Sequence, residues 1–180
     1  METAVATKTK WGIDATHSEV QFKVKHLVIS TVTGSFKKFS GSVQSEEEDF
    51  NGASVSFSVD VNSVDTNQAD RDKHLKSPDF FAAEQYPTLG FTGQLKRTSG
   101  NDYKLIGPLT IKGTTRPVEL AVSFGGIMVD PYGNTKAGFE VNGKINRKDF
   151  GLTWSAVTET GGVVVSEEVK LQMNIHIVKG

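Results

Sequence analysis

The segment Asp14-Ala15-Thr16-His17-Ser18 contains the three residue types of a hydrolase triad: an acid, an imidazole and a hydroxyl. In such a triad the serine hydroxyl faces the imidazole, and the acid lies behind it. Neighbouring residues on an extended segment point in opposite directions, so His17 and Ser18 are poorly placed to face each other. The pattern favours a turn that enters the first strand. We therefore predict no catalytic residues in this segment.

The histidines and acids do not have the spacing of a metal site. The four histidines, His17, His26, His74 and His176, are scattered along the chain, and none has a close partner of the kind that binds zinc. The acidic stretch 46–49 is typical of a solvated hairpin tip. The chain has no cysteine, which excludes disulfides, thiolate zinc sites and a cysteine nucleophile. No dinucleotide or phosphate-loop motif is present, so we expect neither a metal nor a cofactor.

Two charged groups stand beside apolar residues in a way that suits ligand binding. The first contains Arg71, Asp72 and His74, and it interrupts the alternation of the flanking chain. The second contains Arg147 and Asp149, directly after a predicted strand. Each group alone is typical of a solvated strand end. If a barrel brought both to one mouth, they could hold a polar headgroup through charge-assisted hydrogen bonds.

The elements that position these groups are strands, because the dominant hydrophobic period is two. Val20, Phe22 and Val24 alternate with polar residues, and the same pattern runs through 169–177. Such alternation predicts strands with one dry face and one wet face. Turn-forming residues separate most of the segments. We expect strands at 19–25, 34–44, 54–61, 89–97, 103–112, 118–124, 136–146 and 169–177.

Eight hairpin-linked strands can form either a sandwich or a closed barrel. We favour an all-β fold, an extended eight-stranded antiparallel barrel, because closure removes exposed edges and leaves an interior that is either filled or holds one small ligand. A short helical segment is expected at about 66–83, inside a connection of a length typical of lids and binding loops. We expect residues 1–10 to form an N-terminal tail and residues 11–180 to form a single domain.

The dry face is rich in phenylalanine, with 11 Phe against 3 Tyr. A well-packed core is the simpler explanation for any one of these rings, and a tunnel for a long apolar ligand is the functional one. Gly93, Gly107 and Gly143 lie inside strand patterns and favour curvature or free space. The residues expected to line the tunnel are Phe22, Val24, Phe36, Phe57, Val59, Phe80, Phe81, Phe91, Leu109, Ile111, Phe124, Phe139, Val141, Ile145, Trp154, Leu171, Met173 and Ile175.

Charge and hydropathy exclude several classes of partner. With 20 basic and 21 acidic residues and no long basic run, nucleic acid is not an expected partner. No stretch approaches the roughly 20 apolar residues of a membrane span. The apolar patch 4–6 is too short for the core of a secretion signal. We therefore expect a cytoplasmic location for the chain as given, and a periplasmic one if a signal has been removed.

Four stretches carry a resemblance to a known family, and they span nearly the whole chain. They are WGIDATHS at 11–18 with Phe22 and His26, RDKHL through DFF to YP within 71–87, GPLTIKGTTRPV at 107–118, and KINRKDFGL at 144–152. In this order they resemble the YceI-like family of lipocalin-fold, polyisoprenoid-binding proteins. The resemblance implies a lipocalin-like barrel with a long pore that takes an isoprenoid chain, such as a polyprenyl phosphate or the tail of an isoprenoid quinone. Some relatives are linked to stress responses.

We therefore predict a protein without enzymatic activity that binds, carries or stores an isoprenoid lipid or quinone. In this hypothesis the segment 66–87 covers the pore mouth, with Phe80 and Phe81 toward the interior. Barrels of this kind often pair, which makes a homodimer a further expectation. The residues expected at the polar end of the ligand are His26, Arg71, Asp72, His74, Arg147 and Asp149.

Two alternatives remain open from the sequence. One is a lipid-modifying or hydrolytic enzyme at the barrel mouth that uses His26, His74 or the pair Asp14 and His17. The other is a stress-response barrel with a solid core and a protein partner. A hollow interior favours the carrier over the second alternative.

Overall fold

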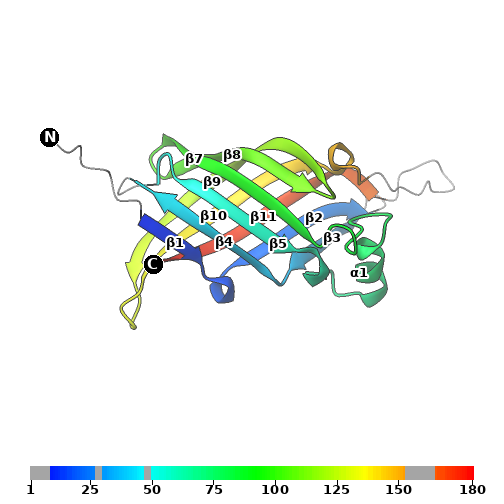
Figure 1. The fold of residues 1–180 in the computed structure, drawn as a ribbon, viewed down its shortest axis with the longest axis horizontal. Coiled ribbons are helices and arrows are strands. Elements are labelled where there is room, and N and C mark those ends of the chain that lie inside the picture. The colour runs from blue at the N-terminus through cyan, green and yellow to red at the C-terminus, as the bar shows by residue number, and fades with distance from the viewer. Residues whose placement is uncertain (1–8, 27–29, 47–49, 153–164) are drawn as a thin grey trace.

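The computed structural model describes residues 9–26, 30–46, 50–152 and 165–180. Within these residues, eleven strands form one antiparallel sheet (Figure 1). The strands are β1 Thr9–Ile13, β2 Glu19–His26, β3 Ser30–Phe36, β4 Phe39–Ser45, β5 Ser54–Asp60, β6 Val64–Asp65, β7 Thr88–Ser99, β8 Asp102–Ile111, β9 Thr114–Val129, β10 Thr135–Asn146 and β11 Val165–Lys179.

The eleven strands correspond to eight positions around a barrel, because three long strands are each broken in two. The pairs are β1 with β2, β3 with β4, and β5 with β6; short 3₁₀ turns at Ala15–His17 and Val61–Ser63 interrupt the first and third. A ring of eight strands, β1-β4-β5-β7-β8-β9-β10-β11, closes through the pairing of β1 with β11. The prediction of an eight-stranded antiparallel barrel is therefore confirmed.

The breaks are the main difference from the sequence prediction. The segment 34–44, expected as one strand, is divided at Lys37-Lys38, so that β3 pairs with β2 while β4 pairs with β1 and β5. The strands β1 and β6 were not predicted. Thr9 and Lys10, which the sequence placed in the N-terminal tail, pair with Ser45 and Gln44.

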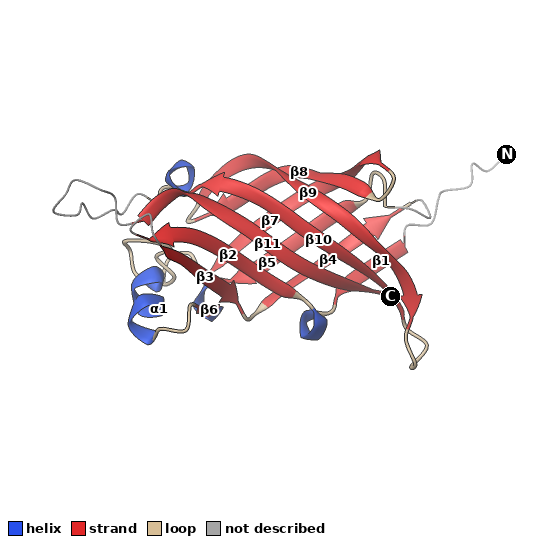
Figure 2. Cartoon of the chain, turned by 180° about the vertical axis from the view of Figure 1, so that it is seen from behind, coloured by secondary structure: helices blue, strands red, loops and turns tan. Residues whose placement is uncertain are grey.

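One side of the barrel is left open by these breaks. The short strand β6 pairs only with Ser35 and Phe36 of β3, and among the described residues it does not pair with β7. The helix α1, Ala69–Lys76, lies at this end of the barrel, away from β1 and the C-terminus (Figures 1 and 2). The open side and the helix thus mark one end of the barrel as its mouth.

The helix α1 is shorter than the predicted segment 66–83. Asn67 has a left-handed φ of 63° before the helix begins. After the helix, Ser77 adopts an extended conformation in front of Pro78, since a residue before proline is disfavoured in the helical region. Acidic residues occupy its first turn and basic residues its last turn, which complements the helix dipole. The prediction of a helix was correct, but its length was overestimated.

Aromatic side chains fill the opposite end of the barrel. Phe50, from the connection between β4 and β5, is almost completely buried. Its ring centroid lies 5.4 Å from Trp11, 5.5 Å from Phe124 and 5.0 Å from Phe139, and Tyr103 packs edge-on against Phe124. We call these five residues the aromatic plug. The plug closes the end of the barrel that lies away from α1.

The glycines inside the strands allow close packing between neighbours. A Cβ added at Gly107 would lie 2.0 Å from the main-chain oxygen of Thr92, and one added at Gly143 would lie 2.2 Å from Leu120. Gly12, by contrast, has nothing within 4 Å of such a Cβ. The space that the sequence suggested at Gly107 and Gly143 is therefore occupied by neighbouring strands and side chains.

We predict that Gly107→Ala lowers the free energy of unfolding by about 1–3 kcal/mol, because β8 must move away from β7 to admit the methyl group. Gly12→Ala is the matched control in β1, and we expect it to be neutral or slightly stabilising. Urea denaturation followed by circular dichroism measures both. Equal losses for the two variants would contradict the close approach of β7 and β8.

Candidate functional site

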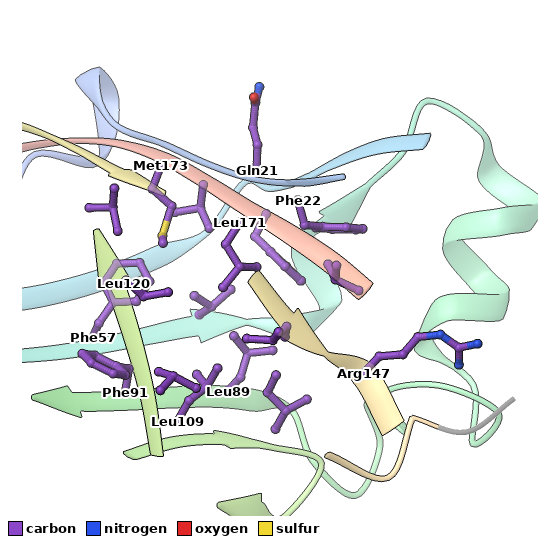
Figure 3. Close-up of a pocket in the computed structure, with 18 of the residues that line it drawn as sticks. Gln21, Phe22, Phe57, Leu89, Phe91, Leu109, Leu120, Arg147, Leu171 and Met173 are labelled. Carbon is purple, nitrogen blue, oxygen red and sulfur yellow. The ribbon is translucent and has the colours of Figure 1, made fainter. Parts of the chain in front are cut away.

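A cavity of about 340 Å³ occupies the interior of the barrel between the aromatic plug and α1. Its wall consists almost entirely of aliphatic and aromatic side chains from both halves of the barrel (Figure 3). The polar side chains in its lining are few, and most of them, including Arg71, His74 and Arg147, belong to the α1 end. The interior is therefore hollow, apolar along its length and cationic at one end.

Most of the residues predicted to line the tunnel do line this cavity. The residues in its wall are Phe22, Val24, Phe36, Phe57, Val59, Phe80, Phe81, Phe91, Leu109, Ile111, Phe139, Val141, Ile145, Leu171, Met173 and Ile175. Phe124 is not in the wall, because its ring packs against Phe50 in the aromatic plug. Trp154 lies outside the described residues.

Sequence reasoning missed several aliphatic residues of the wall and the residue that closes it. Leu89, Leu95, Leu105 and Leu120 line the cavity at the inward positions of β7, β8 and β9. Their period-two spacing places them on the inward face of their strands, and this is the signal that could have identified them. Phe50 follows the acidic loop and lies in no strand, so the alternation of strand residues could not have identified it.

Arg71 is held at the cavity mouth by Thr66. The Arg71 Nε donates to Thr66 Oγ1 at 2.8 Å, and its Nη2 donates to the Thr66 main-chain oxygen at 2.6 Å. Asp72 Oδ1 accepts from the Thr66 main-chain nitrogen at 2.8 Å and from Thr66 Oγ1. Among the described residues, no carboxylate forms an ion pair with Arg71. The guanidinium is therefore fixed in place while its Nη1 edge keeps hydrogen-bonding capacity at the cavity mouth.

His74 also lines the cavity mouth, on the same helix. Its Nε2 lies 2.9 Å from Asp79 Oδ2, and its ring packs edge-on against Phe80 with the centroids 5.1 Å apart. Phe80 is buried, whereas the His74 side chain is 39% exposed. The imidazole can thus reach both solvent and the cavity entrance.

Arg147 is a buried cation whose donors are turned toward the main chain. Its Nε donates to the Ser166 oxygen at 2.8 Å, its Nη1 to the Leu152 oxygen at 2.6 Å, and its Nη2 to the Val165 oxygen at 3.2 Å. Burial lowers the pKa of the Arg147 guanidinium below its ordinary value, although an arginine stays protonated at neutral pH. Figure 3 shows this side chain, at the start of the 3₁₀ turn that follows β10, directed toward the helix. Arg147 therefore ties the end of β10 to β11 and adds positive charge at the mouth.

The remaining predicted headgroup residues have different positions. Asp72 supports Thr66 and does not line the cavity. Asp149 is exposed in the 3₁₀ turn Arg147–Phe150, and its main-chain oxygen accepts from Arg116 Nε at 3.3 Å. His26 ends β2 at the same end of the barrel, as its pairing with Ser30 shows. The two charged groups of the sequence do meet at one mouth, but only Arg71, His74 and Arg147 line it.

The segment Asp14–Ser18 does not form a triad. The Ser18 hydroxyl donates to the Asp14 main-chain oxygen at 2.7 Å and accepts from the His176 main-chain nitrogen at 2.9 Å, so it is not held by an imidazole. Hydrogen bonds from His17 and Lys136 lower the pKa of the Asp14 carboxyl to about 2, although burial opposes this shift. These contacts stabilise the turn that separates β1 from β2. Among the described residues, no group of three or more acids and histidines could hold a metal ion.

An eight-stranded antiparallel barrel with an apolar interior cavity is a lipocalin-like barrel. A model of the YceI-like domain matches residues 11–177. The chain therefore belongs to the YceI-like family.

Similar proteins cover nearly the whole chain. A UPF0312 protein of Pectobacterium carotovorum is 37% identical over 98% of this chain and 88% of its own length. The crystal structure of BcnA from Burkholderia cenocepacia has a TM-score of 0.79 at 25% identity, over 91% of this chain and 98% of that one. A polyisoprenoid-binding domain from Saccharophagus degradans has a TM-score of 0.72 over 94% of this chain and 98% of its own, but at 16% identity it shows the fold alone. No helix in the described part of the chain is long and apolar enough to span a membrane.

We predict that Arg147→Met lowers the free energy of unfolding by about 2–4 kcal/mol, because it removes the donors from one buried and two part-buried carbonyl oxygens. Arg116→Met is the matched control at the same end of the barrel. Its single long contact is exposed, so we expect a change within about 0.5 kcal/mol. Chemical denaturation of both variants measures the difference. A neutral Arg147→Met would show that the three carbonyl contacts do not stabilise the mouth.

Proposed function

We propose that this protein binds and carries an isoprenoid lipid or isoprenoid quinone in its interior cavity, without catalysing a reaction. The observation that carries the proposal is a hollow apolar barrel that is plugged by aromatic rings at one end and cationic at the other. Such a cavity suits a ligand with one long hydrocarbon chain and one polar end. The fold is compatible with this ligand class, since the Saccharophagus degradans domain that shares it is a polyisoprenoid-binding domain.

The hydrocarbon chain would supply most of the affinity. An isoprenoid of roughly eight units exposes several hundred Å² of apolar surface, and at about 25 cal/mol per Å² its burial gives a gross gain of about 10–20 kcal/mol. Ordering the chain and losing its free motion offset much of this gain, so a net affinity between micromolar and nanomolar is reasonable. Tail length and branching therefore decide how tightly a ligand binds.

The polar end of the ligand would lie beside Arg71 and His74. Thr66 holds the Arg71 guanidinium from one side, which lowers the entropy lost when a ligand oxygen binds the Nη1 edge. A phosphate can accept several charge-assisted hydrogen bonds, whereas a prenol or a quinone accepts fewer. The mouth therefore favours an anionic headgroup among ligands that share the same tail.

We predict that Leu171→Trp abolishes or sharply weakens ligand uptake, because the larger side chain enters the cavity from β11. Gln172→Trp is the matched control, since the next residue on the strand is exposed and faces outward. Native mass spectrometry after incubation with a polyprenyl phosphate detects the bound mass. Full uptake by Leu171→Trp, with its fold intact, would place the ligand outside the barrel and overturn the proposal.

We predict that the double variant Arg71→Ala, His74→Ala binds a polyprenyl phosphate tenfold to a hundredfold more weakly, which corresponds to the loss of charge-assisted hydrogen bonds. Its affinity for a prenol of the same length should change much less. Lys73→Ala, on the exposed face of α1, controls for the loss of charge. Competition binding with the two ligands measures the ratio. Equal losses for phosphate and prenol would contradict the position of the headgroup.

A further inference from the structure

The outer face of strands β10, β11 and β2 carries three rows of side chains in direct cross-strand register. Of the three rows, the one on the mouth side consists of three lysines, the middle one of three amides, and the one farthest from the mouth of an acid, an amide and an acid. The rows are Lys144–Lys170–Lys23, Asn142–Gln172–Gln21 and Glu140–Asn174–Glu19. We call them the lysine row, the amide row and the acidic row. Across these three rows the charge therefore changes from positive on the mouth side to negative away from it. One step closer to the mouth than the lysine row, Asn146 pairs with the exposed Glu168. The exposed acids Glu167 and Glu168, closer to the mouth, each form an ion pair with a lysine, Lys148 and Lys144 respectively.

In the lysine row, the number of ion pairs with acidic residues is smaller than the number of lysines. Lys144 Nζ lies 3.3 Å from Glu168 Oε1, but no described carboxylate forms an ion pair with Lys23 or Lys170. Lys25, two residues beyond Lys23 toward the mouth, is also exposed and without such a partner in the described residues. Like charges directly opposite each other on neighbouring strands lower stability. The arrangement would be relieved by an anionic surface outside the molecule.

The position of the lysine row connects it to the cavity. The inward neighbours Phe22, Ile145 and Leu171 line the cavity, so the lysines lie directly outside its wall near the mouth. The acidic row lies four residues farther along the strands, which is about 13 Å at 3.3 Å per residue. This distance exceeds the Debye length of about 8 Å at physiological ionic strength. An anionic surface in contact with the lysine row would therefore be largely screened from the acidic row.

We propose that the lysine row docks the mouth of the barrel onto an anionic lipid membrane. This inference rests on the proposed function, since a carrier of isoprenoid lipids must take up and release its ligand at a membrane. Lysines near an anionic bilayer each contribute favourable electrostatic energy, and the effect is confined to the charges closest to the surface. The graded face orients the barrel with α1 and the mouth toward the lipid.

The test is sedimentation with vesicles made of equal parts phosphatidylcholine and phosphatidylglycerol, compared with vesicles of phosphatidylcholine alone. The triple variant Lys23→Gln, Lys144→Gln, Lys170→Gln should bind the anionic vesicles about fivefold more weakly per lysine, hence on the order of a hundredfold in all. The matched control is Lys10→Gln, Lys96→Gln, Lys179→Gln, which removes the same charge from the other end of the barrel. This control variant should bind the anionic vesicles like the unmodified protein, and added salt should release both proteins from the vesicles.

Two results would overturn the docking proposal: equal binding of the protein to neutral and anionic vesicles, or equal binding by the two triple variants. Uptake of a polyprenyl phosphate from detergent solution separates this proposal from the proposed function. The lysine-row variant should take up the ligand as the unmodified protein does, because its substitutions lie outside the cavity. Vesicle binding that depends on the lysines in a protein that takes up no isoprenoid would contradict the carrier function and leave the docking surface established.

Discussion

The structure depends on one edge of β11, which two different strands share. Residues Ile177–Lys179 pair with β1 and close the ring of eight, while residues from Val165 to Asn174 pair with β2. This division forces the breaks in the first strands. It closes the barrel at the end that contains β1 and the C-terminus, and it leaves the other end to β2, β3, β6 and α1. One end can therefore be plugged and the other can serve as a mouth.

The same three strands carry the two chemical properties on which the proposed function depends. Inward residues of β2, β10 and β11 form part of the apolar wall, and outward residues form the graded rows of charge. Because side chains alternate along a strand, a single register aligns the apolar residues inside the barrel with the lysine, amide and acidic rows outside it. The axis along which a lipid would lie and the axis along which charge changes are therefore the same. A carrier that takes up its ligand end-on from a membrane would need this alignment.

The sequence predicted the barrel and most of the cavity wall, because alternation with period two determines which side chains face inward. It also led to the hypothesis that Arg71 and Arg147 meet at one mouth, and the structure brings both there, Arg71 in α1 and Arg147 directly after β10. It did not predict the breaks, which depend on how β11 is shared by strands distant in sequence. It could not predict that Phe50 belongs to the aromatic plug or that Thr66 holds Arg71 through hydrogen bonds. Phe50 and Thr66 lie in connections between strands, where the sequence has no regular period. Phe124 was assigned to the wall because its strand position is inward, but a neighbouring ring draws it into the plug.

The most direct test of the central claim is a crystal structure of the protein after incubation with a polyprenyl phosphate. We expect continuous ligand density along the cavity, with the phosphate beside the Nη1 edge of Arg71 and the tail ending against Phe139 in the aromatic plug. An interior closed by its own side chains, with the lipid bound elsewhere, would contradict the claim. So would a chain that lies in the reverse direction, with its headgroup at the plug.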